Sequence, residues 1–179
     1  TPGYFDFVGE VEEAVAAADA AIIVVSGKSG DGQLKIYGEK KFKLTLSGVE
    51  LTSSKGPAIN DQCKKRAFVH LTEGTTNRLT DAATYSEEPR YLNGGSSASE
   101  DRKGCFFSEG NLIFSGTGVL AVEGNYKHGI VTDGYFYMRP GVTLAVTGAA
   151  KNAIHAKGDE DDGIGVYIAG GLVSVSYPH

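Results

Sequence analysis

The chain of 179 residues contains no tryptophan, one methionine, five prolines and two cysteines. Cys63 and Cys105 lie far apart and form no CxxC pair, so neither a disulfide framework nor a cysteine-based zinc site is indicated. No stretch is long and apolar enough to span a bilayer, and the sequence contains no signal peptide. The formal net charge of −5 disfavours nucleic-acid binding, because neutralising phosphates requires a basic surface.

Glycine, by contrast, is abundant, with 25 residues. Together with the scarcity of long helix-forming runs, this favours many short strands separated by tight turns. The acidic residues are clustered, most clearly in the stretch GDEDDG. The length allows one domain with a substantial core, or one domain with an appendage.

The opening thirty residues follow a different pattern from the rest. A helix is predicted there, because four apolar residues recur at helical spacing: Phe7, Val8, Val11 and Val15. The run AAIIVVSG then predicts a buried strand that ends at a glycine. Residues 1–30 are therefore predicted to form a short helix–strand segment.

This segment resembles the second-switch region of translational GTPases of the elongation-factor-G type, in which Thr-Pro-Gly leads into a helix and a strand. The aspartate that opens that motif is absent, and Tyr4 stands where those GTPases carry their catalytic histidine. The chain has no GxxxxGK[ST] phosphate loop and no Asn-Lys-x-Asp motif, so GTP is not an expected ligand. The segment is interpreted as a GTPase-like fragment or as a cap on the remainder of the chain.

From residue 31 onward the chain is organised by an internal repeat. The stretch KGCFFSEGNLIFSGTGVLAVEGNY is followed directly by KHGIVTDGYFYMRPGVTLAVTGAA, and a third unit begins at Lys151. An earlier unit begins at Lys55, and a polar stretch up to Arg102 interrupts the period. Equivalent residues recur every 24 positions: Phe106, Ile130 and Ile154; Gly110, Gly134 and Gly158; Leu120 and Leu144; Val122 and Val146; Gly124 and Gly148.

Such a repeat predicts a mainly β solenoid, a parallel β-helix whose coils stack at about 4.8 Å. Leucine-rich repeats need a consensus that is missing, and propeller blades are about twice as long. The apolar columns are expected to point inward. The glycines are expected at corners where the backbone needs a positive φ.

Several motifs of residues 31–179, among them LTEGTTNRLTD, KGCFFSEGNLIFSGTG and GVYIAGG, resemble a bacterial carbohydrate-binding family. The resemblance implies a right-handed parallel β-helix that is extracellular or on the cell surface. It also implies binding of plant polysaccharides, including acidic ones, and stabilisation by calcium. Both ends are shorter than in such proteins, so a truncated β-helix is expected.

Coil stacking would place Lys103, Lys127 and Lys151 in one row, with Lys55 in the earlier unit. Like charges at this spacing repel one another unless something neutralises them. A polyuronate chain is one candidate ligand for the row. The alternative is that each lysine is solvated or paired with a nearby acid.

A second column would hold Glu109 and Asp133, with Asp61 as the equivalent residue in the earlier unit. Carboxylates brought together in this way raise one another's pKa, and calcium relieves the repulsion because it takes six to eight oxygen ligands. The insertion after Gly158 supplies three further candidate ligands: Asp159, Asp161 and Asp162. A flexible acidic loop without a metal is the alternative for this insertion.

Aromatic residues alternate with apolar ones in two segments, so that Tyr137 and Tyr167 are expected to point outward on adjacent coils. Flat aromatic rings bind the faces of sugar rings, but a tyrosine ladder can also serve only to stabilise stacking. The histidines have no serine or cysteine placed to form a catalytic triad, so no catalytic residue is predicted.

The sequence thus favours a non-catalytic module that binds plant cell-wall polysaccharide, cellulosic or acidic and pectin-like, with calcium. A polysaccharide lyase acting on polyuronates is one alternative. It would need a base directed at the proton next to the uronate carboxylate. A structural or adhesin-like surface solenoid is the other.

Overall fold

The computed structural model describes residues 3–7, 13–17, 22–86, 100–158, 161, 163 and 165–176. All regular structure in these residues is β-strand, so this part of the chain has no helix that could cross a membrane. The strands are β1 Gly3–Phe7, β2 Glu13–Ala17, β3 Ile22–Ser29, β4 Gln33–Tyr37, β5 Phe42–Thr52, β6 Ile59–Asp61, β7 Ala67–Leu71, β8 Thr76–Thr80, β9 Gly104–Ser108, β10 Leu112–Gly116, β11 Val119–Gly124, β12 His128–Thr132, β13 Phe136–Met138, β14 Thr143–Ala149, β15 Ile154–Ala156, β16 Val166–Ile168 and β17 Leu172–Val175.

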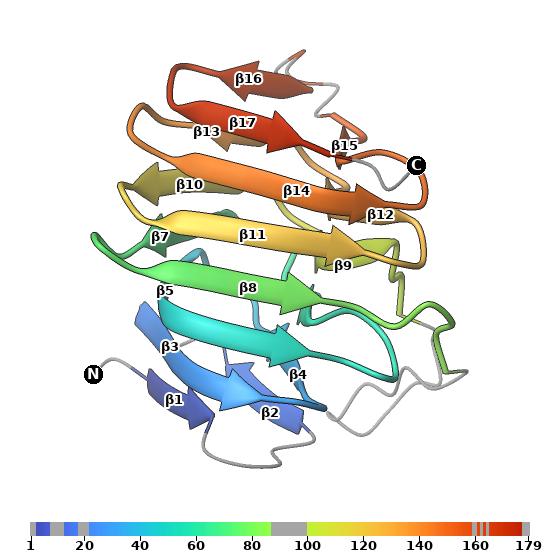
Figure 1. Cartoon of the computed structure of the whole chain (residues 1–179). Helices are drawn as coiled ribbons and strands as arrows, with labels where there is room; N and C mark the ends of the chain where they lie inside the picture. The colour runs from blue at the N-terminus through green and yellow to red at the C-terminus, as the bar shows by residue number, and fades with distance from the viewer. Residues whose placement is uncertain are drawn as a thin grey trace.

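The strands form a parallel β-helix, as predicted. Every strand pairing is parallel, and the coils follow one another along one axis, from the blue N-terminal strands to the red C-terminal strands in Figure 1. One sheet has six strands in the order β15-β12-β9-β6-β4-β2. The other has eleven strands and divides at β5 into two arms, β7-β10-β13-β16 and β8-β11-β14-β17.

The division of this sheet begins in β5, a strand of 11 residues. Its first part, from Phe42 to Leu46, pairs with β7, and its last part, from Glu50 to Thr52, pairs with β8. Gly48 lies between the two parts with a φ of 80°, a conformation that residues with a Cβ rarely adopt. The later coils use separate strands for the two arms, which gives each coil three outer faces.

The core is built from inward columns in register. Phe106, Ile130 and Ile154 are Cα partners on β9, β12 and β15, as the 24-residue period predicts. The ring of Phe114 lies 5.9 Å from that of Phe106 and 5.4 Å from that of Phe136, measured between centroids. Burial of each such side chain contributes about 1.5–3 kcal/mol, so the stacked coils stabilise one another through this interior.

The predicted N-terminal helix is wrong. Glu13–Ala17 is a strand that pairs with β4, and Gly3–Phe7 is a strand that pairs with β3. The terminal coil of a solenoid has edge strands with unpaired backbone N–H and C=O groups. The hydrogen bonds gained by pairing with these strands outweigh the helix preference suggested by a few apolar residues at helical spacing. Val8 and Val11 lie outside the described residues. The buried strand predicted from AAIIVVSG is confirmed as β3.

Two predictions about glycines also need correction. Leu120–Leu144 and Val122–Val146 are partners as expected, but Gly124 pairs with Ala149, because a β-bulge shifts the register after Val122. Gly110 does not have a positive φ. A Cβ at this position would lie 2.1 Å from the carbonyl oxygen of Lys65, so close backbone approach requires the glycine.

A buried polar ladder crosses the six-stranded sheet. Asp61 is in register with Ser108, and not with Glu109 as predicted. The Asp61 carboxylate accepts hydrogen bonds from the Cys63 backbone N–H at 2.9 Å and from the Ser108 hydroxyl at 2.7 Å. Burial raises the pKa of Asp61 to about 7, and these hydrogen bonds only partly oppose the effect.

This raised pKa predicts a stability that depends on pH. The folded state holds the proton of Asp61 up to about pH 7, whereas the unfolded chain releases it near pH 4, so the free energy of unfolding falls as pH rises between these values. Asp61→Asn should flatten this part of the curve of Tm against pH, while Asp161→Asn at an exposed position should not. If the curve of Asp61→Asn had the same slope as that of the wild type, Asp61 would not be the group responsible for this pH dependence.

Candidate functional site

Three carboxylates come together on the outer surface at the end of β9 and β12. Glu109 follows β9, Asp133 follows β12, and the coils are joined there by the hydrogen bond from the Asp133 backbone N–H to the Ser108 carbonyl at 3.0 Å. Asp101 arrives from the segment that precedes β9. One oxygen from each carboxylate lies within 4.8 Å of the others. We call Asp101, Glu109 and Asp133 the acidic cluster.

Lys103 forms ion pairs with the acidic cluster and is not a solvated member of a lysine row. Its ammonium group lies 2.5 Å from Asp101 Oδ2 and 2.8 Å from Asp133 Oδ1. Burial opposes the charge of this ammonium group, but the hydrogen bonds to Asp101 and Asp133 outweigh burial and raise the pKa of Lys103. Of the predicted lysine row, Lys103 is therefore paired with two acids, as in the alternative interpretation.

The acidic cluster fits a metal ion of the kind that prefers oxygen. Burial, and then the charges of Asp133 and Asp101, raise the pKa of Glu109, and Lys64 and Lys103 only partly oppose this rise. A cation held by all three would have to replace Lys103, whose ammonium group now binds both oxygens of Asp133. Each of the three side chains offers one oxygen ligand to a metal ion, and a calcium ion would need further oxygen ligands besides these.

Of the other predicted metal ligands, only Asp161 lies within the described residues. Asp161 is exposed and is not one of the three clustered carboxylates. Asp159 and Asp162 lie outside the described residues. Asp101 was missed by the sequence argument because it belongs to the polar stretch that interrupts the period and has no equivalent 24 residues later.

Lys127 and Lys151 remain as neighbours on consecutive coils, joined by the hydrogen bond from the Lys151 backbone N–H to the Lys127 carbonyl at 2.6 Å. Neither forms an ion pair with a described residue. Beside them the rings of His128 and His155 stack at 4.5 Å with an angle of 11° between their planes. We call Lys127, His128, Lys151 and His155 the basic corner.

Positive charge accumulates at the basic corner. Burial, together with the smaller effects of the charges of His155, Lys151 and Lys127, lowers the pKa of His128 to about 4. His128 is therefore neutral at physiological pH. Its Nδ1 accepts the backbone N–H of Asn152 at 3.2 Å, so the ring carries its proton on Nε2 and can donate from there.

Tyr137 and Tyr167 point outward on adjacent coils, as predicted. They are Cα partners on β13 and β16, next to the buried Phe136 and Met138. Their rings stack at 5.0 Å with an angle of 21° between the planes. Each ring therefore has one face against the other, and the half-exposed Tyr167 offers its second face at the last coil.

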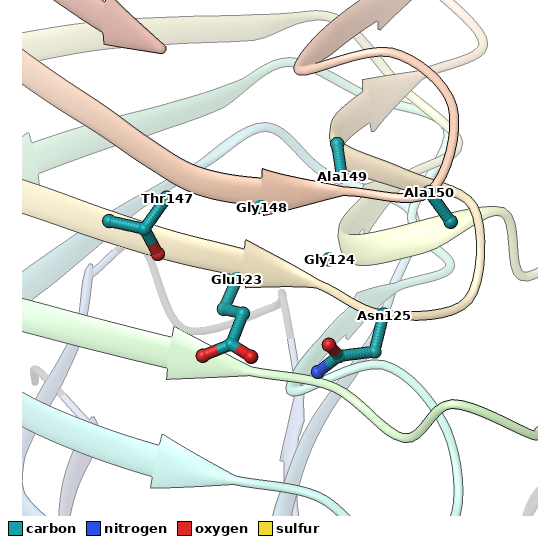
Figure 2. Close-up of a pocket in the computed structure, with 7 residues that line it drawn as sticks. All are labelled: Glu123, Gly124, Asn125, Thr147, Gly148, Ala149 and Ala150. Carbon is teal, nitrogen blue, oxygen red and sulfur yellow. The ribbon is translucent and has the colours of Figure 1, made fainter. Parts of the chain in front are cut away.

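A shallow pocket of about 200 Å³ lies at the bulge between β11 and β14 (Figure 2). We call it the bulge pocket; its lining residues are Glu123, Gly124, Asn125, Thr147, Gly148, Ala149 and Ala150. Its two lining segments run directly into the basic corner, since Lys127 follows Asn125 by two residues and Lys151 follows Ala150. No sequence pattern predicted this pocket, because it depends on the register shift.

Comparisons with known proteins agree with this architecture. No curated protein matches the chain by sequence. A solved structure described as "polysaccharide lyase-like protein from C. thermocellum, Gadolinium derivative" aligns with a TM-score of 0.64 at 21% identity, over 97% of this chain and 81% of the other. The model of the family described as "Carbohydrate-binding domain-containing protein" matches residues 11–176, a range that begins inside the segment 1–30. The chain therefore belongs to this family of carbohydrate-binding domains.

Proposed function

We propose that this domain binds plant cell-wall polysaccharide without cleaving it, and that among the cellulosic and acidic classes it prefers acidic, pectin-like chains. The observation that carries this preference is the basic corner. Lys127 and Lys151 lie on consecutive coils, and no described acid forms an ion pair with either. The extracellular or cell-surface location implied by the resemblance belongs to the same proposal.

The physical argument is one of unbalanced charge. Two ammonium groups on neighbouring coils repel each other, and this cost falls when an anion lies between or across them. A polyuronate carries one carboxylate on each sugar, so an extended chain can offer carboxylates to both lysines. The Nε2–H of neutral His128 adds a hydrogen-bond donor that does not titrate near neutral pH.

The same geometry favours binding over elimination. A lyase needs a base directed at the proton next to the uronate carboxylate. The neutral His128 is not available as this base, because its lone pair is on Nδ1 and already accepts the N–H of Asn152. We therefore expect no unsaturated, ultraviolet-absorbing product on polygalacturonate.

The ion that we propose for the acidic cluster is calcium. Its three donor side chains are all carboxylates, and calcium tolerates the irregular geometry that such a cluster offers. The ion would supply the positive charge that Lys103 now supplies, and would tie Asp101 to the ends of β9 and β12. Its expected role is to stabilise the stacking of these coils.

The lysine pair can be tested by affinity electrophoresis in gels that contain polygalacturonate. We expect Lys127→Ala/Lys151→Ala to weaken retention by roughly tenfold or more, because both cations that attract the uronate carboxylates are removed. A tenfold loss corresponds to about 1.4 kcal/mol of binding free energy. Lys40→Ala/Lys41→Ala is the matched control, with the same loss of charge at two exposed lysines. Rising salt should weaken wild-type binding. Equal retention of the wild type and both double variants would argue against the proposed surface.

The metal site can be tested by thermal melting with calcium. We expect the Tm of the wild type to rise with calcium, and Glu109→Gln and Asp133→Asn to lose this response. Lys103→Met removes the competing ammonium group, so this variant should bind calcium roughly tenfold more tightly than the wild type does. Asp161→Asn, outside the acidic cluster, should behave as the wild type. No rise in Tm at millimolar calcium in either the wild type or Lys103→Met would exclude the site.

A further inference from the structure

The bulge pocket is created by one extra residue in β14. Val122 pairs with Val146, and the next pair along the two strands is Glu123 with Gly148, so Thr147 has no partner in β11. A bulge of this kind redirects the side chains that follow it. Here it places Gly148, which is itself buried, next to the side chain of the exposed Glu123.

The backbone does not require a glycine at position 148, next to Glu123, whereas it does require one at position 124. At Gly124 a Cβ would lie 2.6 Å from the His128 carbonyl oxygen, so this glycine is required by packing. At Gly148 a Cβ would meet only Glu123 Cγ, at an ordinary contact distance of 3.6 Å, and its φ is not positive. A side chain at Gly148 would fit the backbone but would project into the pocket.

The polar rim of the pocket is rich in hydrogen-bond acceptors. Figure 2 shows the Glu123 carboxylate and the Thr147 hydroxyl on neighbouring strands, with Asn125 beyond the end of β11. The Asn125 amide donates its Nδ2–H to the Asp81 carbonyl at 3.0 Å, which leaves its Oδ1 as an acceptor. The Glu123 carboxylate is exposed and accepts only. Ligand hydroxyl groups can therefore donate hydrogen bonds to this rim.

The charges determine which part of a sugar can enter. The Glu123 carboxylate repels a uronate carboxylate but accepts hydrogen bonds from two neighbouring hydroxyl groups. Both lining segments continue into the basic corner, through Tyr126 to Lys127 and directly to Lys151. Acceptors for hydroxyls and cations for a carboxylate thus follow one another at this edge of the solenoid.

We propose that the bulge pocket is a subsite for one pyranose ring of an acidic polysaccharide. Its vicinal hydroxyls bind Glu123 and Asn125, and its carboxylate or that of the next sugar lies on Lys127 and Lys151. This inference rests on the proposed function and adds the part of the sugar that each group recognises. It also explains why the small residues Gly148, Ala149 and Ala150 line the hollow.

The test is calorimetric titration with trigalacturonate and with its methyl ester, which keeps the hydroxyls and loses the charge. Gly148→Val fills the pocket, and we expect it to weaken binding of both ligands by at least about tenfold. Ala145→Val is the matched control, because Ala145 also faces outward on β14, between the buried Leu144 and Val146. It should bind both ligands as the wild type does.

The lysine double variant separates the two proposals. The Lys127→Ala/Lys151→Ala variant should bind trigalacturonate only as tightly as it binds the ester. Gly148→Val, in contrast, should lower the affinity for both ligands. If the wild type binds trigalacturonate and Gly148→Val binds it equally well, the pocket assignment is overturned and the proposed function stands. If the wild type binds neither ligand nor polygalacturonate, both proposals fail.

A second variant tests the pocket in case Gly148→Val does not fold correctly. Glu123→Gln leaves the backbone unchanged and removes the charged acceptor, so we expect binding of the ester to weaken several-fold, because a neutral amide oxygen accepts weaker hydrogen bonds than a carboxylate does. Unchanged binding of the ester in Glu123→Gln overturns the assignment, as does an equal loss in Gly148→Val and Ala145→Val.

Discussion

The structure depends on one constraint, the parallel pairing of each strand with its equivalent in the next coil. Backbone hydrogen bonds run along the axis of the solenoid, so a residue is fixed chiefly by its partner about one repeat away. The interior columns follow from this register, and so does the buried ladder of Asp61 and Ser108. An extra residue within a strand would turn the side chains that follow in that strand to the opposite face unless a bulge absorbs it, as the bulge at Thr147 does.

The same constraint assembles the surface. Residues with no local relation to each other become neighbours because they hold the same position in consecutive coils, as Lys127 and Lys151 do at the basic corner. Where the repeat is interrupted, new groups enter. Asp101 reaches Glu109 and Asp133 from a segment outside the period, and the bulge at Thr147 opens a pocket that a regular ladder would close.

The period of 24 residues was sufficient to predict the fold, the inward columns and the outward pair Tyr137 and Tyr167. The fold and the columns follow from the repeat, because a parallel ladder turns sequence spacing into contact, and the outward direction of the two tyrosines follows from their alternation with apolar residues. The predicted N-terminal helix was wrong because pairing with β3 and β4 decides the structure of the opening segment. A helical spacing of apolar residues contains no information about such partners.

The site was predicted less completely, for physical reasons that differ from residue to residue. The approach of Glu109 to Asp133 was confirmed, since both hold equivalent positions. Pairing of a lysine with a nearby acid was one of the alternatives and holds for Lys103, but its partners Asp101 and Asp133 were not predicted, because Asp101 depends on the path of the segment before β9. Gly124 and Gly148 were predicted as partners, and one bulge separates them. Ligand-binding roles for the lysines and tyrosines stay predictions.

The central claim is that acidic polysaccharide binds at the edge where the bulge pocket meets the basic corner. The most direct measurement is the change in backbone amide NMR signals of the isotope-labelled domain as trigalacturonate is added. The account predicts shifts concentrated in residues 123–128 and 147–152, with small changes elsewhere. Shifts confined to the strands that carry Tyr137 and Tyr167, or no shifts at saturating trigalacturonate, would contradict it.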